Sequence, residues 1–586
     1  MRVNWLKDIY IDFCPLSSNL AFARVEPPLE SFKRRPSPAS SFSLGDHPVF
    51  PCNPIAEFPD FRTMDVLAKV KSVTALRRTS NESGEAEQPP QKLGMVVDMT
   101  ESSFMATLLP VVGMNEQDRH RYSRPEFLYF SEEETELSSD HTVRPVLCPK
   151  FPTKMPAYCG YAEAINAGKT LKNEDMASAK RLRIIQHGYN AVEAVELGEE
   201  RSPLNVEGRK PLDEPLLIAD NVSSDESDSP PYADAAFFGI FDGHAGSGAA
   251  LMGAYHLSQH IVNRLGSVVE ALIQLDKRES ISSKKCPITS PVTVSSLVTG
   301  ALETAFLDMD EQIQQEKQSW RISGGCAAIT AFFLFDKLYV ANAGDCRAVL
   351  LTSHGVKQLS TDFNPSQERK RLQFLAYKQP ELIGNCFSRL EYNRYLNKKD
   401  LKGSVLYRDW YMDGWAVKTV TENDIPPPLI CERRKKYRLL NTIGVSRGFG
   451  DHHLITVDDK IPIKPFLSAV PEVQVFDISS LDVLTDRDVL VLGSDGLWDV
   501  LSNERVGEIV NSVLENSESD DHLKYTIAAQ ELVIAARGNP SGTGKWTLTG
   551  GGQASTDDIT AFVIPLKYAI GQPSDEDDDD DEEMLK

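Results

Sequence analysis

Four turns that border short apolar runs carry aspartate: Asp242 in FGIFDGHAG, Asp345 in VANAGDCR, Asp495 in LVLGSDGLWD and Asp557 in ASTDDIT. An acid at a strand end is held rigidly by the sheet, and a neighbouring glycine lets the backbone or a ligand come close. Carboxylates with few Cys or His nearby suit the oxygen-preferring cations Mg²⁺ and Mn²⁺. A single Asp-Gly pair is more often a turn than a ligand, but four such turns favour a metal site.

The elements that must position these acids are short β-rich runs bounded by turn residues, with helical stretches between them. The expected strands are 235–241, 329–335, 337–341, 348–352, 489–493 and 559–565. The expected helices are 247–275, 295–317, 503–515 and 521–537, the last stopped by Gly538 and Pro540. Hairpin-linked strands mixed with long helices predict an α+β fold of antiparallel sheets covered by helices, not a doubly wound parallel sheet.

Composition limits the function classes. The chain has 586 residues and a net charge of −23, which argues against a general nucleic-acid binder. Its 9 cysteines include no CxxC pair, so a disulfide framework or zinc site is not expected and a reducing compartment is favoured. The start, MRVNWLKDIYIDF, lacks a signal-peptide core, and the longest apolar stretch, 327–335, is far too short to span a bilayer. We expect a soluble protein of the cytoplasm, with the nucleus left open as a second location.

The two ends of the chain differ in composition from its middle. Residues 1–154 hold long stretches rich in Pro, Ser, Glu and Gln and are predicted to be a largely disordered extension. Within them, KRRPSPASS (33–41) and RRTSNES (77–83) fit sites for basophilic kinases, although a merely solubilising tail is as good an interpretation. Residues 568–586 are predicted to be a disordered, solvated acidic tail.

Six segments of the middle region resemble the metal-dependent protein phosphatase family (protein phosphatase 2C type) in order and approximate spacing. They are FFGIFDGHAG, SGGCAAITAFF, LYVANAGDCRAVL, IGVSRGFGD, VLVLGSDGLWDVLSNE and STDDITAFVI, and GKTLKNEDMAS fills the slot of the family's first acidic motif. The resemblance covers about 155–567, the predicted phosphatase domain. GYAEAINAG and DHTVRPVLCP further resemble one branch of the family, which has a long N-terminal extension and an enlarged flap insertion.

The resemblance implies a fold and a metal centre. The fold would be a β-sandwich of two antiparallel sheets flanked by helices, with two Mg²⁺ or Mn²⁺ ions at one edge and a weaker third. Asp242 would bridge the two ions, the Gly243 carbonyl would assist it, and Glu174 would reach the second ion through water. The full set of implied metal ligands is Asp242, Gly243, Asp495, Asp557, Glu174, Asp345 and Asp499. The third ion would take Asp345 together with Asp495 or Asp499.

The implied catalytic residues are His244, Asp242 and Asp495. Two cations about 3.5–4 Å apart lower the pKa of a bridging water and hold a phosphoryl group for in-line attack. His244, two residues from the bridging acid, is placed to protonate the departing alkoxide. A lone His after Asp-Gly would usually be incidental; within this motif the general acid is favoured.

One position departs from the family pattern. Where the family usually has a phosphate-binding Arg, four residues before the Glu of the first acidic motif, this chain has Thr170. Lys169 beside it is the candidate phosphate-binding residue. Lysine binds phosphate as a point charge and lacks the bidentate fork of arginine.

The sequence therefore predicts a Mg²⁺- or Mn²⁺-dependent phosphatase that acts on phosphoserine and phosphothreonine in proteins. A catalytically inactive binding module on the same fold is the alternative, but such a module should have lost metal-binding aspartates. A metal-dependent phosphodiesterase or nuclease is disfavoured by the acidic charge and the lack of a basic aromatic groove. The expected partner is a phosphorylated protein and not a nucleic acid; the branch resemblance points only weakly to small GTPases, and the oligomeric state is left open.

The flap-like insertion, 391–441, has its own composition. It contains 11 Lys or Arg, 7 Asp or Glu and seven aromatic residues in an otherwise acidic chain. A cationic, aromatic-rich surface is typical of protein interfaces. The insertion is therefore predicted to recognise folded substrate, with ERRKK (432–436) assisting encounter, unless its aromatics serve only a small core of its own.

Overall fold

The computed structural model describes residues 124–131, 143–166, 173–186, 231–281, 292–320, 322–433, 436–518, 521–541 and 545–569, with single residues at 134, 135 and 138. Several predictions fall outside the described residues: both kinase-site motifs, Lys169, and the acidic run from residue 570 onward.

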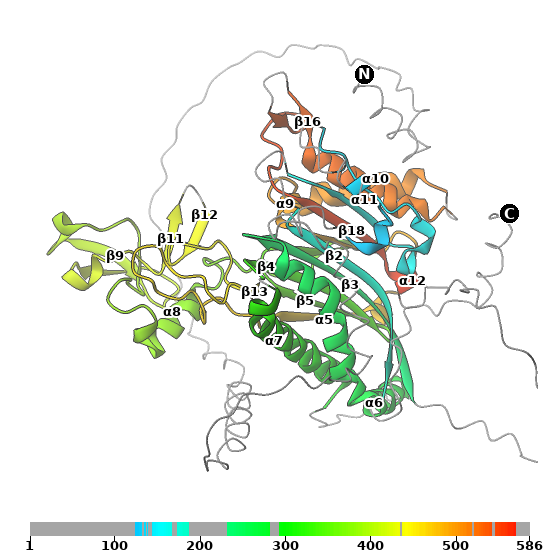
Figure 1. The fold of residues 1–586 in the computed structure, drawn as a ribbon, viewed down its shortest axis with the longest axis horizontal. Coiled ribbons are helices and arrows are strands. Elements are labelled where there is room, and N and C mark those ends of the chain that lie inside the picture. Colours follow the sequence, from blue (N-terminus) through cyan, green and yellow to red (C-terminus); the bar gives the residue numbers. More distant parts are fainter. Residues whose placement is uncertain are drawn as a thin grey trace, which may run out of the picture. The chain divides into compact units, whose positions relative to one another are not determined.

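Two antiparallel sheets form the centre of the described region (Figure 1). The first has the order β14 (Glu472–Asp477), β5 (Lys337–Ala343), β4 (Gly325–Leu334), β3 (Tyr232–His244) and β2 (Asp175–Ile185), and β13 (Phe449–Gly450) also pairs with β4. The second has the order β1 (Gly160–Ala164), β18 (Ile559–Pro565), β15 (Val489–Gly493), β6 (Arg347–Thr352) and β7 (Gly355–Gln358). The observed β15 and β18 have the predicted bounds.

Side-chain alternation explains how the sheets stack. Successive residues of a strand point to opposite faces, so Phe238 and Ile240 of β3 enter the core between the sheets. Phe238 meets Phe562 of β18 there, with ring centroids 6.0 Å apart. The alternate residues of β3, Phe237 and Phe241, pack in a second core on the outer face of the first sheet. Both faces of β3 are therefore buried, which explains its nearly continuous apolar sequence.

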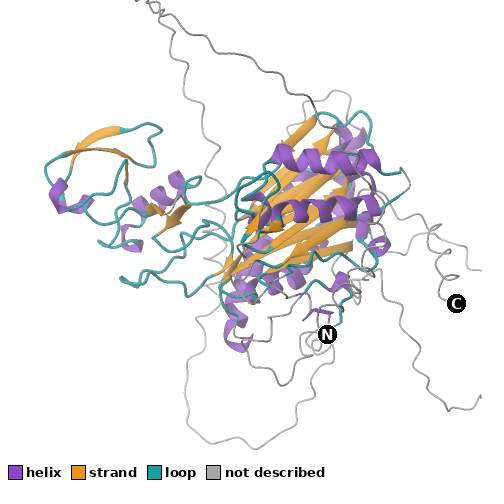
Figure 2. Ribbon diagram, turned by 90° about the horizontal axis from the view of Figure 1, so that it is seen from above, coloured by secondary structure: helices purple, strands orange, loops and turns teal. Residues whose placement is uncertain are grey.

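Helices cover both outer faces, as Figure 2 shows. The first sheet is covered by α5 (Gly248–Gly266), α6 (Val269–Ile281) and α7 (Val294–Trp320). The second is covered by α10 (Asn503–Asn516) and α11 (Leu523–Arg537), with the short α9 (Asp495–Trp498) and α12 (Leu566–Ala569) at its margins. The predicted α-β-β-α sandwich is confirmed. No helix in the described ranges is long and apolar enough to cross a membrane.

One predicted helix was wrong. The stretch 247–275 is two helices, because α5 ends at Gly266 and α6 begins at Val269. Glycine has the lowest helix propensity after proline, and the break follows it directly.

Some residues of the predicted N-terminal extension belong to the sandwich. Leu128 is fully buried in the core between the sheets. The backbone of Leu147 exchanges hydrogen bonds of 2.9 and 3.0 Å with Glu163 of β1. The described residues before 155 therefore extend the second sheet and help to close its core.

The insertion begins after α8 (Arg369–Lys378); it contains short strands and the 3-10 helices η5 (Lys398–Asp400) and η6 (Glu422–Asp424). The strands are β8 (Glu391–Tyr392), β9 (Ser404–Arg408) and β10 (Ala416–Thr419), which form one sheet, and the hairpin of β11 (Ile430–Arg433) and β12 (Lys436–Leu439). A separate small core joins the base of the insertion to α8 and to the segment before β14. Leu372, Leu439 and Phe466 are fully or almost fully buried in it.

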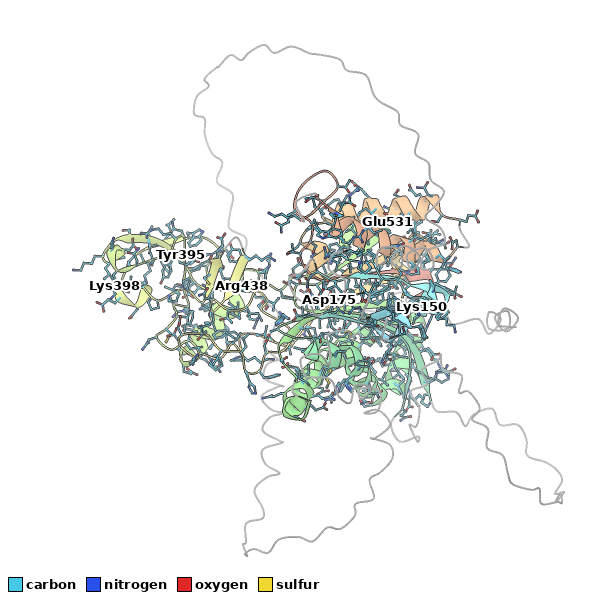
Figure 3. The ribbon with its side chains drawn as sticks, turned by 45° about the horizontal axis from the view of Figure 1, so that its top comes forward. Lys150, Asp175, Tyr395, Lys398, Arg438 and Glu531 are labelled. Carbon is cyan, nitrogen blue, oxygen red and sulfur yellow. The ribbon has the colours of Figure 1, made fainter. Side chains whose placement is uncertain are left out.

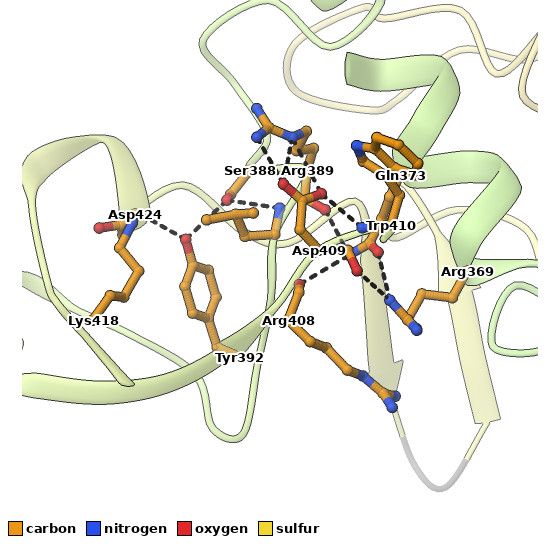
Figure 4. A network of polar contacts seen from close by, with 11 residues as sticks. Arg369, Gln373, Ser388, Arg389, Tyr392, Arg408, Asp409, Trp410, Lys418 and Asp424 are labelled. Atoms are coloured by element: carbon orange, nitrogen blue, oxygen red, sulfur yellow. Dashed lines mark hydrogen bonds and ion pairs between the residues drawn. The ribbon is translucent and has the colours of Figure 1, made fainter. Parts of the chain in front are cut away.

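Polar contacts hold the outer part of the insertion (Figure 4). Asp409 is buried and receives hydrogen bonds from Arg389 of 3.1 and 2.7 Å to one oxygen. Asp424 is also buried and accepts from Tyr392 at 2.7 Å, from Lys418 at 2.6 Å and from the Thr421 hydroxyl at 2.8 Å. Charge-assisted hydrogen bonds thus replace much of the apolar core that so small a segment lacks.

Replacing Asp424 by Ala should loosen the insertion. Burial opposes ionisation, but hydrogen bonds from Lys418, Thr421 and Tyr392 lower the pKa of Asp424 to about 2. Removing one partner of a buried ion pair costs about 3 kcal/mol. In this variant the cost should appear as a lower free energy for local opening of the insertion. Because the unfolded pKa is about 3.9, this stabilisation is present above that pH and is lost as the pH falls toward 2.

Hydrogen exchange of the insertion's backbone amides would measure this effect. Asp413→Ala, which breaks an exposed pair with Lys370, is the control and should leave the protection of these amides nearly unchanged. Equal protection in the Asp424 variant and the wild type would contradict the prediction.

Candidate active site

The predicted acids lie at one edge of the sandwich because the strands that carry them are antiparallel. Asp242 near the end of β3 pairs in register with Asp175 at the start of β2, which Figure 3 labels. In the other sheet, β15 ends two residues before Asp495, and β18 begins two residues after Asp557. The backbone N–H of Asp495 donates to the Asp242 carboxylate at 3.2 Å. The structure thus joins acids that are separated by 253 positions in sequence.

Burial and, after it, mutual repulsion disfavour the charged form of the acids at this edge. Burial raises the pKa of Asp242 well above its ordinary value, and the charges of Asp175, Asp495, Asp345 and Asp557 raise it further. Burial also raises the pKa of Asp495, with added repulsion from Asp345 and Asp557. Each residue of the predicted set Asp242, Asp345, Asp495, Asp557 and Glu174 is nevertheless only half-buried. The acids therefore line a place that solvent and ions reach.

Asp345 and Asp499, predicted for the third ion, are also neighbours. Burial raises the pKa of Asp345 to about 6, and the charge of Asp499 contributes to that rise. Asp499, just after α9, forms an ion pair of 2.8 Å with Lys436 of β12. Both partners are more than half exposed, so the pair contributes little stability. It does bring a cation of the insertion to the acidic edge.

The turn between β3 and α5 is tightly packed against Glu174. A Cβ atom at Gly243 would lie 2.3 Å from the Glu174 carbonyl oxygen, so only glycine fits there. The N–H of Gly243 donates to that oxygen at 3.1 Å. The N–H of Gly246 donates to the Glu174 carboxylate at 2.8 Å. The turn therefore orients the Glu174 side chain at the same edge.

His244 is held by Asp451, a contact that sequence reasoning missed. The Nε2 atom of His244 lies 2.6 Å from the Asp451 carboxylate, whose side chain is only 4% exposed. Burial alone would lower the pKa of His244, but the hydrogen bond and charge of Asp451 raise it. His244 is thus biased toward the protonated form, which a proton donor requires.

Two further buried acids were also missed. Asp175 accepts a hydrogen bond of 2.7 Å from the Thr560 hydroxyl, which links the two sheets. Asp558 accepts from the backbone N–H groups of Asn166 at 2.9 Å and Glu174 at 3.0 Å. Each directly follows a predicted ligand, Glu174 or Asp557, so the paired acids in NEDM and TDDI were the available signal.

The donor set fits divalent cations by its chemistry. It offers carboxylate and carbonyl oxygens, which Mg²⁺ and Mn²⁺ prefer, and a cation would relieve the repulsion that raises the pKa values. Within the described ranges, no three His, Cys, Asp or Glu side chains are already close enough together to hold an ion. The fit therefore rests on the kind of donor, their shared edge and their mutual repulsion.

Arg144 secures the loop that carries Asp557. Its guanidinium is fully buried and donates to the carbonyl oxygens of Ile165, Ser555 and Asp557 at 2.6, 3.0 and 3.0 Å. These bonds tie the segment before β1 to the loop before β18. Arg144 thus fixes the backbone of a predicted metal ligand from outside the acidic edge.

Arg144→Met keeps most of the side-chain volume but removes these donors, which leaves buried carbonyl groups unpaired. We expect it to lower the free energy of unfolding by about 3 kcal/mol, because hydrogen bonds from charged groups are each worth roughly 1.5–3 kcal/mol. Urea unfolding would measure the change. Arg183→Met, which breaks an exposed pair with Asp234, should cost under about 1 kcal/mol; equal effects of the two variants would refute the assignment.

Comparison with known proteins identifies the family of the chain. The model of the family described as "Protein phosphatase 2C" matches residues 209–403 and 431–541. Human "Protein phosphatase 1H" is 41% identical over 482 residues, which cover 76% of this chain and 91% of the relative. Human "Protein phosphatase 1J" is 39% identical over 467 residues, covering 76% and 86%. A solved "serine-threonine phosphatase 2C from Toxoplasma gondii" is 19% identical, covers 56% of this chain and 84% of its own, and has a TM-score of 0.31.

These matches span most of the sandwich and include the strands that carry Asp242 and Asp495. The family acts on phosphoserine and phosphothreonine in proteins and depends on Mg²⁺ or Mn²⁺. The chain belongs to the protein phosphatase 2C family and is a protein serine/threonine phosphatase.

Proposed function

We propose that the acidic edge binds two divalent cations and is the centre where phosphoserine and phosphothreonine are hydrolysed. Asp242, the Gly243 carbonyl, Asp495, Asp557 and Glu174 would hold the two ions. When bound, such ions supply a water nucleophile at neutral pH and stabilise the charge of the transferred phosphoryl group. The observation that carries the proposal is the meeting of acids from both sheets at Asp242, which pairs in register with Asp175 and accepts from the Asp495 N–H at 3.2 Å.

A third, weaker cation would lie between Asp345 and Asp499. Support comes from their mutual repulsion and from the Lys436 ion pair, in which a cation already contacts Asp499. Lys436 would have to give way to that ion, because both compete for one carboxylate.

His244 would donate the proton that the departing serine or threonine oxygen needs. It lies at the end of β3, two residues after Asp242, and Asp451 keeps its ring oriented. The ring is about one-third exposed, so a bound substrate has access to it. Lys169, outside the described residues, stays the candidate for binding the substrate phosphate.

Six of the seven aromatic residues of the insertion divide into two groups, which bears on substrate recognition; the seventh, Tyr407, is half-buried. Trp410 packs on Phe374 at 4.9 Å, and Tyr392 donates to Asp424, so these two serve the interior of the insertion. Four others are exposed: Tyr395, Tyr411, Trp415 and Tyr437. Figure 3 labels Tyr395 together with two cations of the insertion, Lys398 and Arg438. The exposed group supports a role for 391–441 in binding the phosphoprotein.

A loop exchange would test that role. Replacing 391–441 by the shorter loop of a relative should leave turnover of p-nitrophenyl phosphate nearly intact and lower activity on a native phosphoprotein at least about tenfold, or about 1.4 kcal/mol. If both substrates lose activity together, the insertion is structural; if neither does, specificity lies elsewhere.

A substrate panel with Mn²⁺ tests the proposed reaction. A phosphothreonine peptide should be hydrolysed, single- and double-stranded DNA should stay intact, and EDTA should stop the reaction. An inactive binding module would bind the peptide without releasing phosphate, whereas a nuclease would cut the DNA. Phosphate release that persists in excess EDTA would contradict the cation requirement.

A further inference from the structure

The carboxylate of Asp310, in the middle of α7, is bound from three sides. One oxygen accepts from the backbone N–H of Gly450 at 2.8 Å and from His452 Nε2 at 3.0 Å, and the other accepts from Lys464 at 2.6 Å. His452 Nε2 also lies 3.1 Å from the Asp310 carbonyl oxygen. Because both neighbours are acceptors, Nε2 must carry the proton. Asp310 is thus a single anchor for the turn 450–452.

The residue between the two anchored ones is Asp451, which has an unusual backbone. Its φ of 54° lies in the left-handed region that non-glycine residues seldom occupy. Its N–H donates to the Gly324 carbonyl at 3.0 Å. A residue in this region persists only where its surroundings fix it. For Asp451, these surroundings are Gly324, which accepts its N–H, and its neighbours Gly450 and His452, which are both bound to Asp310.

Asp451 connects the turn 450–452 to the candidate active site, because its carboxylate is hydrogen-bonded to His244. The contact between Asp451 and His244 crosses β4 at Gly325. This glycine pairs with His244 on one side and with Gly450 on the other. A Cβ atom at Gly325 would lie 2.5 Å from the Asp451 carboxylate. The contact is therefore closely packed, and a small displacement of the turn would shift the His244 ring.

We propose that Asp310 is a positioning residue for His244, acting through Gly450, His452 and Asp451. The proposal rests on the proposed role of His244 as proton donor. The bonds of the Asp310 carboxylate to described residues go to Gly450, His452 and Lys464. Its contribution is to hold the turn so that the Asp451 carboxylate meets Nε2 of His244 at hydrogen-bonding distance. Loss of that alignment should matter most where the departing oxygen needs a proton.

The same helix offers a matched control. Asp308, two residues before Asp310, pairs with Arg264 of α5 through bonds of 2.6 and 2.7 Å. It has no bond to the turn 450–452 among those of the described residues. Asp308→Asn and Asp310→Asn therefore make the same chemical change on one helix and differ in the connection to Asp451.

The full chain would be assayed with Mn²⁺ on a phosphothreonine peptide and on p-nitrophenyl phosphate, whose phenolate leaves without a proton. Asp310→Asn should lower the ratio of peptide to p-nitrophenyl phosphate turnover at least about tenfold, since general acid catalysis contributes about 10²–10⁴-fold. Asp308→Asn should leave the ratio unchanged. In a His244→Ala background, Asp310→Asn should cause no further fall in the ratio.

Hydrogen exchange gives a readout independent of catalysis. The amides of residues 449–453 should exchange faster in Asp310→Asn than in Asp308→Asn. If Asp310→Asn does not fold, His452→Ala is the second variant, because it removes one of the bonds between Asp310 and the turn. It should lower the same turnover ratio and speed exchange of the same amides.

Each of these results either supports or overturns the positioning role of Asp310. Equal losses on both substrates, or an unchanged ratio, would make Asp310 a structural residue and overturn it while leaving the proposed reaction standing. A wild-type chain that releases no phosphate from either substrate would instead overturn the proposed function, and the inference with it.

Discussion

Asp242→Asn is expected to remove Mn²⁺-dependent phosphate release while leaving the metal-free fold at least as stable as the wild type. The first effect should exceed about 100-fold, because even changes next to metal ligands typically cost 10–100-fold in affinity or activity. The second follows from the repulsion that Asp175, Asp495, Asp345 and Asp557 exert on the Asp242 carboxylate. An amide removes that repulsion and can still accept from the Asp495 N–H, whose bond to Asp242 is 3.2 Å long.

Thermal unfolding with EDTA and with Mn²⁺ would separate the two effects. Mn²⁺ should raise the melting temperature of the wild type and have little effect on Asp242→Asn. Asp234→Asn, at the opposite end of β3, is the control, because its exposed pair with Arg183 is remote from the acidic edge. A variant that keeps activity, or one whose metal-free form is markedly destabilised, would show that Asp242 is a structural acid.

His244→Ala should separate substrates by the quality of their leaving group. A phosphothreonine peptide, whose alkoxide leaves poorly, should lose about 10²–10⁴-fold in turnover, whereas p-nitrophenyl phosphate should change little. The physical reason is that His244, held by Asp451 at 2.6 Å, supplies a proton that a phenolate does not require.

His260→Ala is a suitable control for this experiment. His260 lies on α5 and pairs with Gln312 of α7 at 2.7 Å, away from the Asp451 contact. Its loss should affect both substrates equally or not at all. Parallel losses on both substrates in His244→Ala would assign His244 to the metal centre or to the fold, and not to proton donation.

Six strands of the sandwich, β3, β4, β5, β6, β15 and β18, were predicted because burial on both faces makes their sequences apolar, whereas β1, β2, β7 and β14 were missed. β15 and β18 have this property along their whole lengths, and their bounds match the prediction. The insertion gave no such signal, since its strands have only 2–5 residues and are held by polar contacts such as those of Asp424. Short strands of this kind lack the alternation on which prediction depends.

The candidate site was predictable only where an acid borders an apolar strand. Asp242 and Asp495 satisfy that rule, and the structure places them together. The partners of Asp175 are distant in sequence: Asp242 lies on the neighbouring strand β3, and Thr560 lies in the other sheet. Asp451 is 207 residues from His244. Long-range pairings of this kind depend on the tertiary fold, so they could be found only in the structure.

Counting the bound Mn²⁺ ions would show directly whether the acidic edge is a binding site for divalent cations. Equilibrium dialysis of the full chain, with and without EDTA, would measure the number of ions per chain. The wild type should bind at least two ions that EDTA releases, and Asp242→Asn should bind clearly fewer. A wild-type chain that binds no more Mn²⁺ than Asp242→Asn would contradict the cation-binding role of the acidic edge.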